Sequence, residues 1–329
     1  MNLRERSRGW HVTGIVGSLA AAFGRRPGST VRPMSDRARS GIAFALLAAL
    51  FWGVSGAVAA DAFADVSPAR VAEARALVTA LFFVPLAWSR GLLAPRSGTL
   101  WFALFGVNLA VVNVTFYWAM DRLGVGPGAT IQFLAPIFIL LWMAAVQKRR
   151  VVPAVWVAAV VAVTGVSLIT EAWGLEGGDW VGVVWGLVSA VAFASYLMFG
   201  EYLGRSYPSL TIVTWGFLFA SVVWLVFQPL WSFPTDLSPA VWGKLLWVGL
   251  VGTAIPFLFE VSALRRASSG IVGVIATTEP VFAAATAWVL LDQYLSAVQI
   301  AGGAMVLVAA ALVQRWGASD VEVPLEPTR

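Results

Sequence analysis

The chain has 329 residues, of which 59% are hydrophobic and only 12% are charged, and its net charge is +5. Because soluble domains carry about 25% charged residues, this composition excludes an ordinary water-facing surface and indicates that most of the chain faces lipid or other helices. There is no cysteine, so disulfides, thiolate metal sites and a cysteine nucleophile are excluded, and no basic stripe with interleaved aromatic residues indicates a nucleic-acid partner.

The N-terminal residues 1–38 are polar and rich in arginine. Their apolar stretch from Val12 to Phe23 is shorter than the roughly 20 residues that span a bilayer. Arg25 and Arg26 stand where a signal peptide would need small residues for cleavage. We therefore expect a disordered cytoplasmic tail, with Met34 as a second candidate start of translation just before the first long apolar segment.

The rest of the chain is a regular succession of ten apolar segments joined by short connections. Backbone in hydrocarbon must satisfy its own hydrogen bonds, so each segment is predicted to form a transmembrane helix and the fold to be an all-α integral membrane protein. The predicted spans are 41–61, 70–89, 99–119, 126–146, 152–170, 180–200, 209–230, 242–263, 269–291 and 296–314. The polar residues 317–329 are predicted to form a disordered C-terminal tail.

Basic and acidic residues gather at alternate connections between these segments. With the N-terminus in the cytoplasm, the inner connections include Lys148, Arg149 and Arg150, and the outer ones include Asp61, Asp65, Glu171, Glu176 and Asp179. Lysine and arginine are enriched in cytoplasmic loops. This bias predicts that both termini are cytoplasmic and that the protein crosses the cell membrane many times.

Residues 119–138 resemble residues 263–282 without a gap. The matched pairs are Ala119 with Ala263, Arg122 with Arg266, Gly126 with Gly270, Ile131 with Ile275, Pro136 with Pro280 and Phe138 with Phe282. Each half of the chain holds five predicted helices, and an odd number inverts the second half relative to the first. We therefore predict two inverted repeats, 39–173 and 178–316, an arrangement typical of secondary transporters that work by alternating access.

Several motifs resemble those of EamA-type members of the drug/metabolite transporter superfamily. They are Phe51-Trp52-Gly53, Arg75 within Ala74-Arg75-Ala76-Leu77, the prolines Pro136 and Pro280, and Leu290-Leu291-Asp292 followed by Gln299 and Gly302-Gly303. The family usually has glutamate where this chain has Lys148 and Asp292. The resemblance covers about residues 40–315 and implies secondary transport, often export, of small metabolites.

Glu279 is the foremost candidate for a functional group inside the membrane. It lies midway along the ninth predicted helix, between Thr278 and Pro280. An ionisable group at the centre of a membrane helix costs roughly 2.5–3.5 kcal/mol to insert and is a functional candidate by default. The proline leaves a carbonyl group without its helical donor, and burial favours a protonated carboxyl group, which suits proton coupling. The alternative is a structural glutamate bonded to a neighbouring helix.

Two further charged residues are candidates for substrate binding or proton coupling. Glu260 lies in the eighth predicted helix, and an ion pair with Arg265 or Arg266 is its alternative role. Arg75 lies more than a turn inside the second predicted helix. It could hold a substrate carboxylate through its planar guanidinium group, or pair with Glu73 or Asp61.

Polar side chains on the predicted helices could line a central cavity, with Trp52 shaping it. They are Ser55, Asn108, Asn113, Tyr117, Gln132, Ser195, Tyr196 and Thr253. Amide groups in lipid are costly without partners, which makes Asn113 and Gln132 the most informative of them. The alternative is hydrogen bonding between helices and, for Trp52, plain packing.

These features predict a secondary transporter that exports small metabolites by alternating access. Its partners are a small-molecule substrate, the lipid bilayer and, if transport is coupled, protons; amino acids or their derivatives, nucleosides and drugs remain open as substrates, and so does the oligomeric state. The alternatives are a channel or an intramembrane enzyme. The enzyme is disfavoured because the single histidine, His11, lies in the tail and no catalytic or nucleotide-binding motif is present. We expect no cofactor and no metal.

Overall fold

The computed structural model describes residues 36–93, 98–148, 151–171, 179–291 and 294–316. The expected disordered tails and the candidate start Met34 lie outside the described residues, as do Arg149, Arg150, Glu176 and Asp292. The first helix begins at Asp36, so the last three residues assigned to the N-terminal tail are helical.

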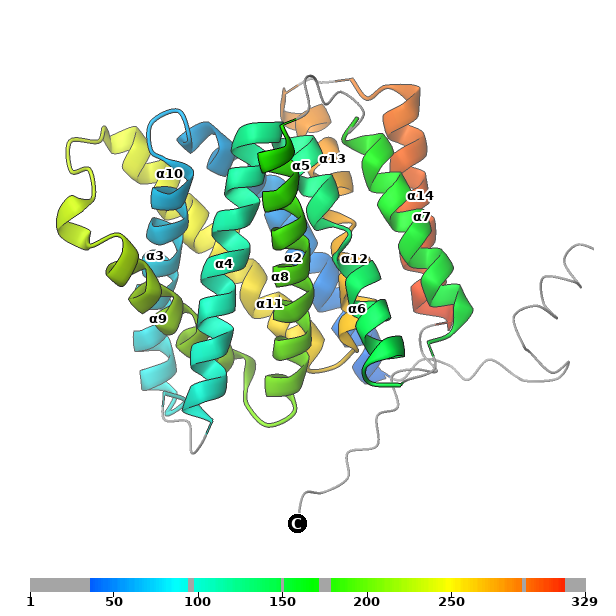
Figure 1. The fold of residues 1–329 in the computed structure, drawn as a ribbon, viewed down its shortest axis with the longest axis horizontal. Coiled ribbons are helices and arrows are strands. Elements are labelled where there is room, and N and C mark those ends of the chain that lie inside the picture. The colour runs from blue at the N-terminus through cyan, green and yellow to red at the C-terminus, as the bar shows by residue number, and fades with distance from the viewer. Residues whose placement is uncertain (1–35, 94–97, 149–150, 172–178, 292–293, 317–329) are drawn as a thin grey trace, which may run out of the picture. The chain divides into compact units, whose positions relative to one another are not determined.

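The described residues form helices joined by short connections (Figure 1). The first half comprises α2 (Asp36–Ala62), α3 (Pro68–Ser89), α4 (Thr99–Leu123), α5 (Val125–Gln132), α6 (Ala135–Ala145) and α7 (Pro153–Ile169). The second half comprises α8 (Trp180–Gly204), α9 (Ser209–Phe227), η1 (Leu230–Ser232), α10 (Pro239–Gly249), η2 (Leu250–Ala254), α11 (Ile255–Leu264), α12 (Ser269–Ala276), α13 (Glu279–Leu291) and α14 (Ala297–Trp316).

Eight helical spans in this part of the chain are long and apolar enough to cross a membrane, and two shorter apolar helices, α7 and α14, complete the ten predicted segments. Three of the spans are built from consecutive pieces: α5 with α6, α10 with η2 and α11, and α12 with α13. The prediction of an all-α membrane protein with ten spans is confirmed.

The fourth and ninth spans are broken at matching places. α5 ends at Gln132 and α6 begins at Ala135, while α12 ends at Ala276 and α13 begins at Glu279. Pro136 and Pro280 follow these breaks, and a proline inside a helix removes a backbone hydrogen bond and clashes with the carbonyl four residues back. Figure 1 shows α5 above α6 but α12 below α13, so the two spans run in opposite directions, as the inverted architecture requires.

The eighth span contains a π-helix, η2, that the sequence did not predict. Pro256 cannot donate to the carbonyl of Gly252, and the chain widens just before it. Two carbonyl groups along this wider turn accept hydrogen bonds from α3: Thr79 Oγ1 donates to Gly249 O at 2.9 Å, and Arg75 Nη2 donates at 3.2 Å to Gly252 O, the carbonyl that Pro256 leaves without a helical donor. The irregular segment is thus attached to α3, and π-bulges frequently occur at functional sites.

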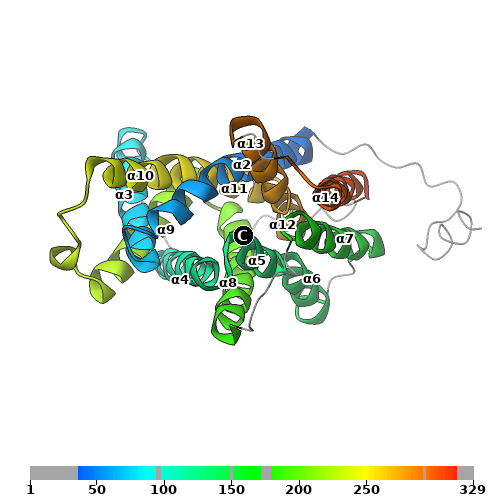
Figure 2. The same cartoon turned by 90° about the horizontal axis from the view of Figure 1, so that it is seen from above.

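Small residues allow some helices to approach each other closely. α7 and α14 lie side by side in both views (Figures 1 and 2), and a Cβ atom added to Gly165 would lie only 2.7 Å from the carbonyl oxygen of Gly302. Small residues at helix interfaces are typical of membrane bundles because close backbone packing replaces the hydrophobic effect there.

Candidate functional site

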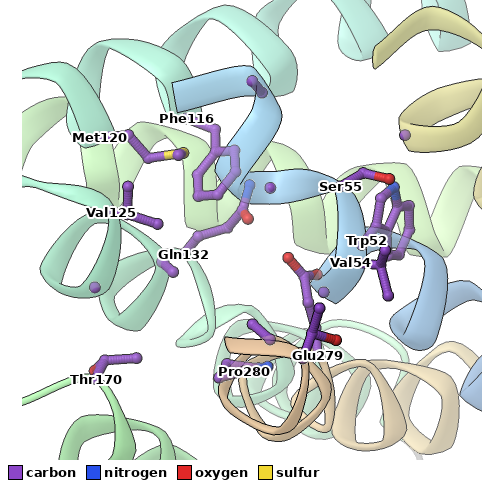
Figure 3. Close-up of a pocket in the computed structure, with 18 of the residues that line it drawn as sticks. Trp52, Val54, Ser55, Phe116, Met120, Val125, Gln132, Thr170, Glu279 and Pro280 are labelled. Carbon is purple, nitrogen blue, oxygen red and sulfur yellow. The ribbon is translucent and has the colours of Figure 1, made fainter. Parts of the chain in front are cut away.

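A cavity of about 500 Å³ lies between the two halves of the chain, with walls from α2, α3, α4, α5, α7, α8, α10, η2, α11, α13 and α14 (Figure 3). Its volume falls within the roughly 300–1,000 Å³ of ligand-binding pockets. The first, third, fourth, sixth, eighth and ninth predicted spans, which carry the predicted cavity residues, all contribute to the walls. Most of the lining is apolar.

Arg75 of α3 is held from three directions at the edge of this cavity. Its Nε donates to Thr253 Oγ1 at 2.8 Å, its Nη1 to Tyr117 Oη at 2.7 Å and its Nη2 to Gly252 O at 3.2 Å. The guanidinium carbon also lies 5.1 Å from the ring centroid of Tyr117 and 5.8 Å from that of Phe257. A guanidinium group has five N–H donors, so two donors have no partner in these contacts.

The alternative ion pairs considered for Arg75 do not form. Glu73 pairs with Arg70 at 2.6 Å, and Asp61 pairs with Lys244 at 2.7 Å. Arg75 is therefore a buried cation whose contacts in the described structure are neutral groups. Buried charges are normally paired or hydrogen-bonded, and a negatively charged ligand would complete this site.

Glu279 is the first residue of α13 and faces the cavity, where its carboxyl group and the amide of Gln132 point into the same space (Figure 3). The charge of Arg75 acts on Glu279, although the two groups do not form an ion pair. A Cβ atom added to Gly53 of α2 would lie 2.7 Å from the carbonyl oxygen of Glu279 and 2.8 Å from the backbone nitrogen of Ala283. Only glycine at position 53 therefore lets α2 pack against the start of α13.

An aromatic cluster bounds the cavity beside these charges. The ring of Trp52 meets Phe257 edge-on at 5.2 Å and Phe193 at 6.5 Å between centroids. All three residues line the cavity. The two phenylalanines were not among the residues predicted for the site, because nothing in the sequence separates them from the other members of a set of 20.

The remaining polar candidates divide into those that line the cavity and those that join helices. Asn113, Tyr117 and Gln132 line it. Asn113 Nδ2 donates to Leu109 O at 2.6 Å, and Gln132 Nε2 donates to Ser189 Oγ of α8 at 2.8 Å, so Gln132 also joins two helices. Ser55 lines the cavity, whereas Asn108, Ser195, Tyr196 and Thr253 lie outside its wall.

Three predicted site residues lie outside the cavity wall. Thr278 is fully buried, and its hydroxyl donates to Ile275 O at 2.8 Å, which satisfies a carbonyl at the helix break. Pro136 is buried at the equivalent break before α6, and Pro280 alone of the two prolines lines the cavity. Glu260 of α11 is fully buried behind the wall.

The ion pair considered for Glu260 does not form. Arg265 Nε donates to Gly204 O at 3.2 Å, and Arg266 Nη1 donates to Ser262 O at 2.6 Å. Both basic side chains are therefore bonded to backbone carbonyls, and neither neutralises the carboxyl group of Glu260.

The cavity reaches one end of the molecule. Its wall includes Met120, Val125, Thr170 and Gln299, which lie where α4 and α7 end and where α5 and α14 begin. Val125 is 46% exposed, so this end of α5 is not covered. Gln299 and Thr170 were not among the predicted cavity residues, because each lies near the end of its predicted span.

Packed side chains close the opposite end. Every residue of α12 is buried. Ser269 at the start of α12 donates its backbone N–H to Glu201 Oε2 of α8 at 2.8 Å, and the guanidinium carbon of Arg266 lies 4.6 Å from the ring centroid of Phe44 in α2. Among the described residues, the cavity is therefore accessible from one end and closed by packed side chains at the other.

Known proteins resemble this chain over most of its length. The model of the EamA-like transporter family matches residues 39–171 and 180–315. The pseudopaline exporter CntI of Pseudomonas aeruginosa strain UCBPP-PA14 is 28% identical over 282 residues, which cover 85% of this chain and 98% of that protein. The threonine/homoserine exporter RhtA of Escherichia coli K12 is 26% identical over 200 residues, 60% of this chain and 64% of that protein.

A solved structure, described as "Crystal structure of protein", has a similar fold. It superposes with a TM-score of 0.70 at 18% sequence identity, and the match covers 86% of this chain and 99% of the solved one. At this identity the similarity concerns the fold alone, and it agrees with the helical arrangement described above.

Proposed function

The chain belongs to the EamA-like transporter family, and we propose that it exports a small metabolite by binding it in the cavity and alternating access between the two sides of the membrane. The observation that carries this proposal is the cavity itself: an apolar chamber between the halves holds an unpaired cation and an unpaired carboxyl group and is sealed at one end. The relatives CntI and RhtA are named as exporters, which supports the direction of transport.

The charges of the cavity favour a substrate that carries both a carboxylate and an amine. The two remaining donors of Arg75 suit a carboxylate, because the planar fork of a guanidinium group matches its geometry. Glu279 suits an ammonium group, and the aromatic cluster of Trp52, Phe193 and Phe257 suits an apolar side chain. Amino acids and their derivatives meet all three conditions, whereas nucleosides and cationic drugs leave the charge of Arg75 without an anionic partner.

Glu279 is proposed to couple transport to protons. In an exporter, a proton and the ammonium group of the substrate would bind the same carboxyl group in turn, so that each leaves when the other arrives. The first-half counterpart of Glu279 is Ala135. The carboxyl group is thus not needed by the repeat fold, which supports a role in coupling.

Alternating access follows from the relation between the repeats 39–173 and 178–316. In the second half, α12 packs against α2, α6, α7, α8, α11 and α14, whereas its counterpart α5 packs against α4, α7 and α8. We propose that in the opposite state α5 closes the end of the cavity that is open here, and α12 moves away from the end that is closed here.

With the tails 1–38 and 317–329 in the cytoplasm of a plasma-membrane protein, the open end faces outward. The sealed end supports a carrier rather than a channel, and the relatives give no support for an enzyme.

A metabolite screen tests this proposal. Cells that overproduce the protein are compared with cells that produce Glu279→Gln, by measuring amino acids in the medium and growth in the presence of toxic amino-acid analogues. We expect overproduction of the wild type to raise the extracellular level of at least one amino acid and to protect against its analogue. An unchanged medium with both proteins, at equal membrane levels, would contradict the proposal.

A further inference from the structure

Glu260 is a buried acid that the cavity does not use. It is fully inaccessible, and neither of its carboxyl oxygens has a hydrogen-bond partner in the described part of the chain. An ionised carboxylate removed from water without a partner is strongly disfavoured. These surroundings therefore favour the neutral, protonated form of the group over the carboxylate.

Its position relative to the cavity is defined by aromatic rings. Phe257, one turn earlier on α11, lines the cavity, and a residue three positions along a helix lies on the same side. The ring of Tyr196 lies 5.4 Å from Phe257 and is stacked on Phe193 at 5.9 Å between centroids. Tyr196 is nevertheless fully buried and outside the cavity wall, so it lies behind the layer formed by Trp52, Phe193 and Phe257.

Tyr196 and Glu260 thus form a second polar region, which lies behind the aromatic layer. The hydroxyl of Tyr196 has no hydrogen-bond partner among the described residues, and it interacts electrostatically with Glu260. Two interacting groups whose oxygen atoms both lack hydrogen-bond partners among the described residues are unusual, because buried polar groups in native structures are nearly always hydrogen-bonded. Exceptions of this kind call for an explanation such as a functional role.

The surroundings of Glu260 contain few other charges. α11 packs against α2, η2, α8, α9 and α12. Of these elements, η2, α9 and α12 carry no ionisable side chain. The ionisable residues of α2 lie near its two ends, and on α8 Tyr196 interacts with Glu260, whereas Glu201 pairs with Arg205. At the far end of α11, Arg37 Nη2 donates to Arg265 O at 2.9 Å, and Arg265 and Arg266 are bonded to backbone as described above. Glu279, directly beyond α12, acts on Glu260 through its charge.

We propose that Glu260 is a second proton-binding site, which exchanges its proton with the side of the membrane opposite the open end of the cavity when the aromatic layer parts. In that step the O–H bond of Glu260 breaks, the proton passes to water of that compartment, and the carboxylate becomes hydrated; the reverse step restores the acid. Glu279 exchanges its proton with the side of the membrane to which the cavity opens. This inference rests on the proposed transport function.

The protonated state can be measured without any substrate. Infrared spectroscopy of the purified full-length protein at neutral pH detects protonated carboxyl groups through their carbonyl stretch. We expect a band in the wild type that is lost in Glu260→Gln and kept in Glu279→Gln. Glu260→Asp is expected to shift this band, which keeps the assignment decisive if Glu260→Gln does not fold. A wild-type spectrum without a band that responds to either change at position 260 overturns the proposal.

The coupling role is tested in vesicles with the amino acid that the export screen identifies. Glu260→Gln is expected to exchange this amino acid at the wild-type rate but to lose all stimulation by a pH gradient, whereas Glu260→Asp retains stimulation. Glu171→Gln, at an exposed glutamate, serves as the matched control and is expected to behave as wild type. Full stimulation in Glu260→Gln, or its loss in both variants, overturns the proposal. Absence of exchange by the wild type would instead refute the proposed transport function, and the infrared result would still report on Glu260.

Discussion

At the scale of single residues, Arg75 and Glu279 are opposite charges that share one cavity without forming an ion pair. Arg75 is fixed in place by Thr253, Tyr117 and the π-helix before any ligand binds. Such preorganisation lowers the cost of binding, because the receptor side chain does not have to be ordered at that moment. The arrangement therefore favours a ligand that brings both of the missing charges.

Replacing Arg75 by glutamine removes the cation and keeps a polar side chain. Hydrogen bonds to charged groups contribute about 1.5–3 kcal/mol, so the KM for an amino-acid substrate is expected to rise by roughly 10- to 100-fold. The carboxamide of the same amino acid lacks the carboxylate and is expected to lose little. Counterflow at graded concentrations measures both values, and an equal loss for the acid and the amide would contradict a carboxylate-binding role.

At the scale of helices, the contact of α2 with the start of α13 positions Glu279. An alanine at position 53 would place its Cβ 2.7 Å from Glu279 O and 2.8 Å from the nitrogen of Ala283. Both atoms are backbone, so the helices must separate. We expect Gly53→Ala to lower stability by about 1–3 kcal/mol, the usual cost of overpacking, and to impair transport.

A control for this change lies one turn away on the same helix. A Cβ atom at Gly56 meets nothing within 4 Å. Because alanine is favoured over glycine in a helix by about 1 kcal/mol, Gly56→Ala is expected to leave the melting temperature in detergent unchanged or raised. Equal melting temperatures for the two variants would show that the close contact at Gly53 is unimportant.

The start of α8 depends on a titratable cap outside the membrane-spanning helices. Asp179 accepts a hydrogen bond from the backbone N–H of Gly182 at 3.0 Å and pairs with Arg122 at 3.1 Å. These contacts, the Gly182 bond first, hold the pKa of Asp179 below its usual value. A carboxyl group with a lowered pKa in the folded state adds stability above its usual pKa and loses it as the pH falls through the folded value.

Asp179→Asn removes the negative charge but keeps the cap of α8, because asparagine is also a good N-cap residue. We expect the variant to keep the start of α8. On acidification, its melting temperature is expected to fall less than that of the wild type. Thermal unfolding in detergent at neutral pH and in the acidic range below the usual aspartate pKa measures it. If the wild type and the variant lose the same stability on acidification, Asp179 is not one of the groups responsible.

At the scale of the whole molecule, the charge bias of the connections predicts that both termini are cytoplasmic. The chain has no cysteine, so single cysteines can be introduced at exposed positions without background. With this orientation, Asp236→Cys between α9 and α10 reacts with an impermeant reagent from outside, and Ser89→Cys at the end of α3 reacts only after the membrane is opened. The reverse pattern would show that the protein is inserted the other way round.

The sequence predicted those features that depend on neighbours along the chain. The ten spans follow from local hydrophobicity, and the breaks at Pro136 and Pro280 follow because proline acts on its own turn. The partners of Arg75 could not be predicted, since Thr253 lies far away in the sequence and meets Arg75 only through the packing of η2 on α3. Of the aromatic layer, Trp52 was predicted, but Phe193 and Phe257 were missed for the same reason, because phenylalanine in an apolar helix carries no local mark of the surface that it faces.

The central claim is that one cavity binds a metabolite and a proton in turn, with Glu279 as the shared group. The most direct test is flux in vesicles that contain the purified full-length protein, with and without a pH gradient, for the wild type and Glu279→Gln. We predict that the wild type concentrates its amino-acid substrate in response to the gradient, whereas Glu279→Gln folds, retains some exchange and no longer responds to pH. Unchanged gradient-driven flux in Glu279→Gln would contradict the claim.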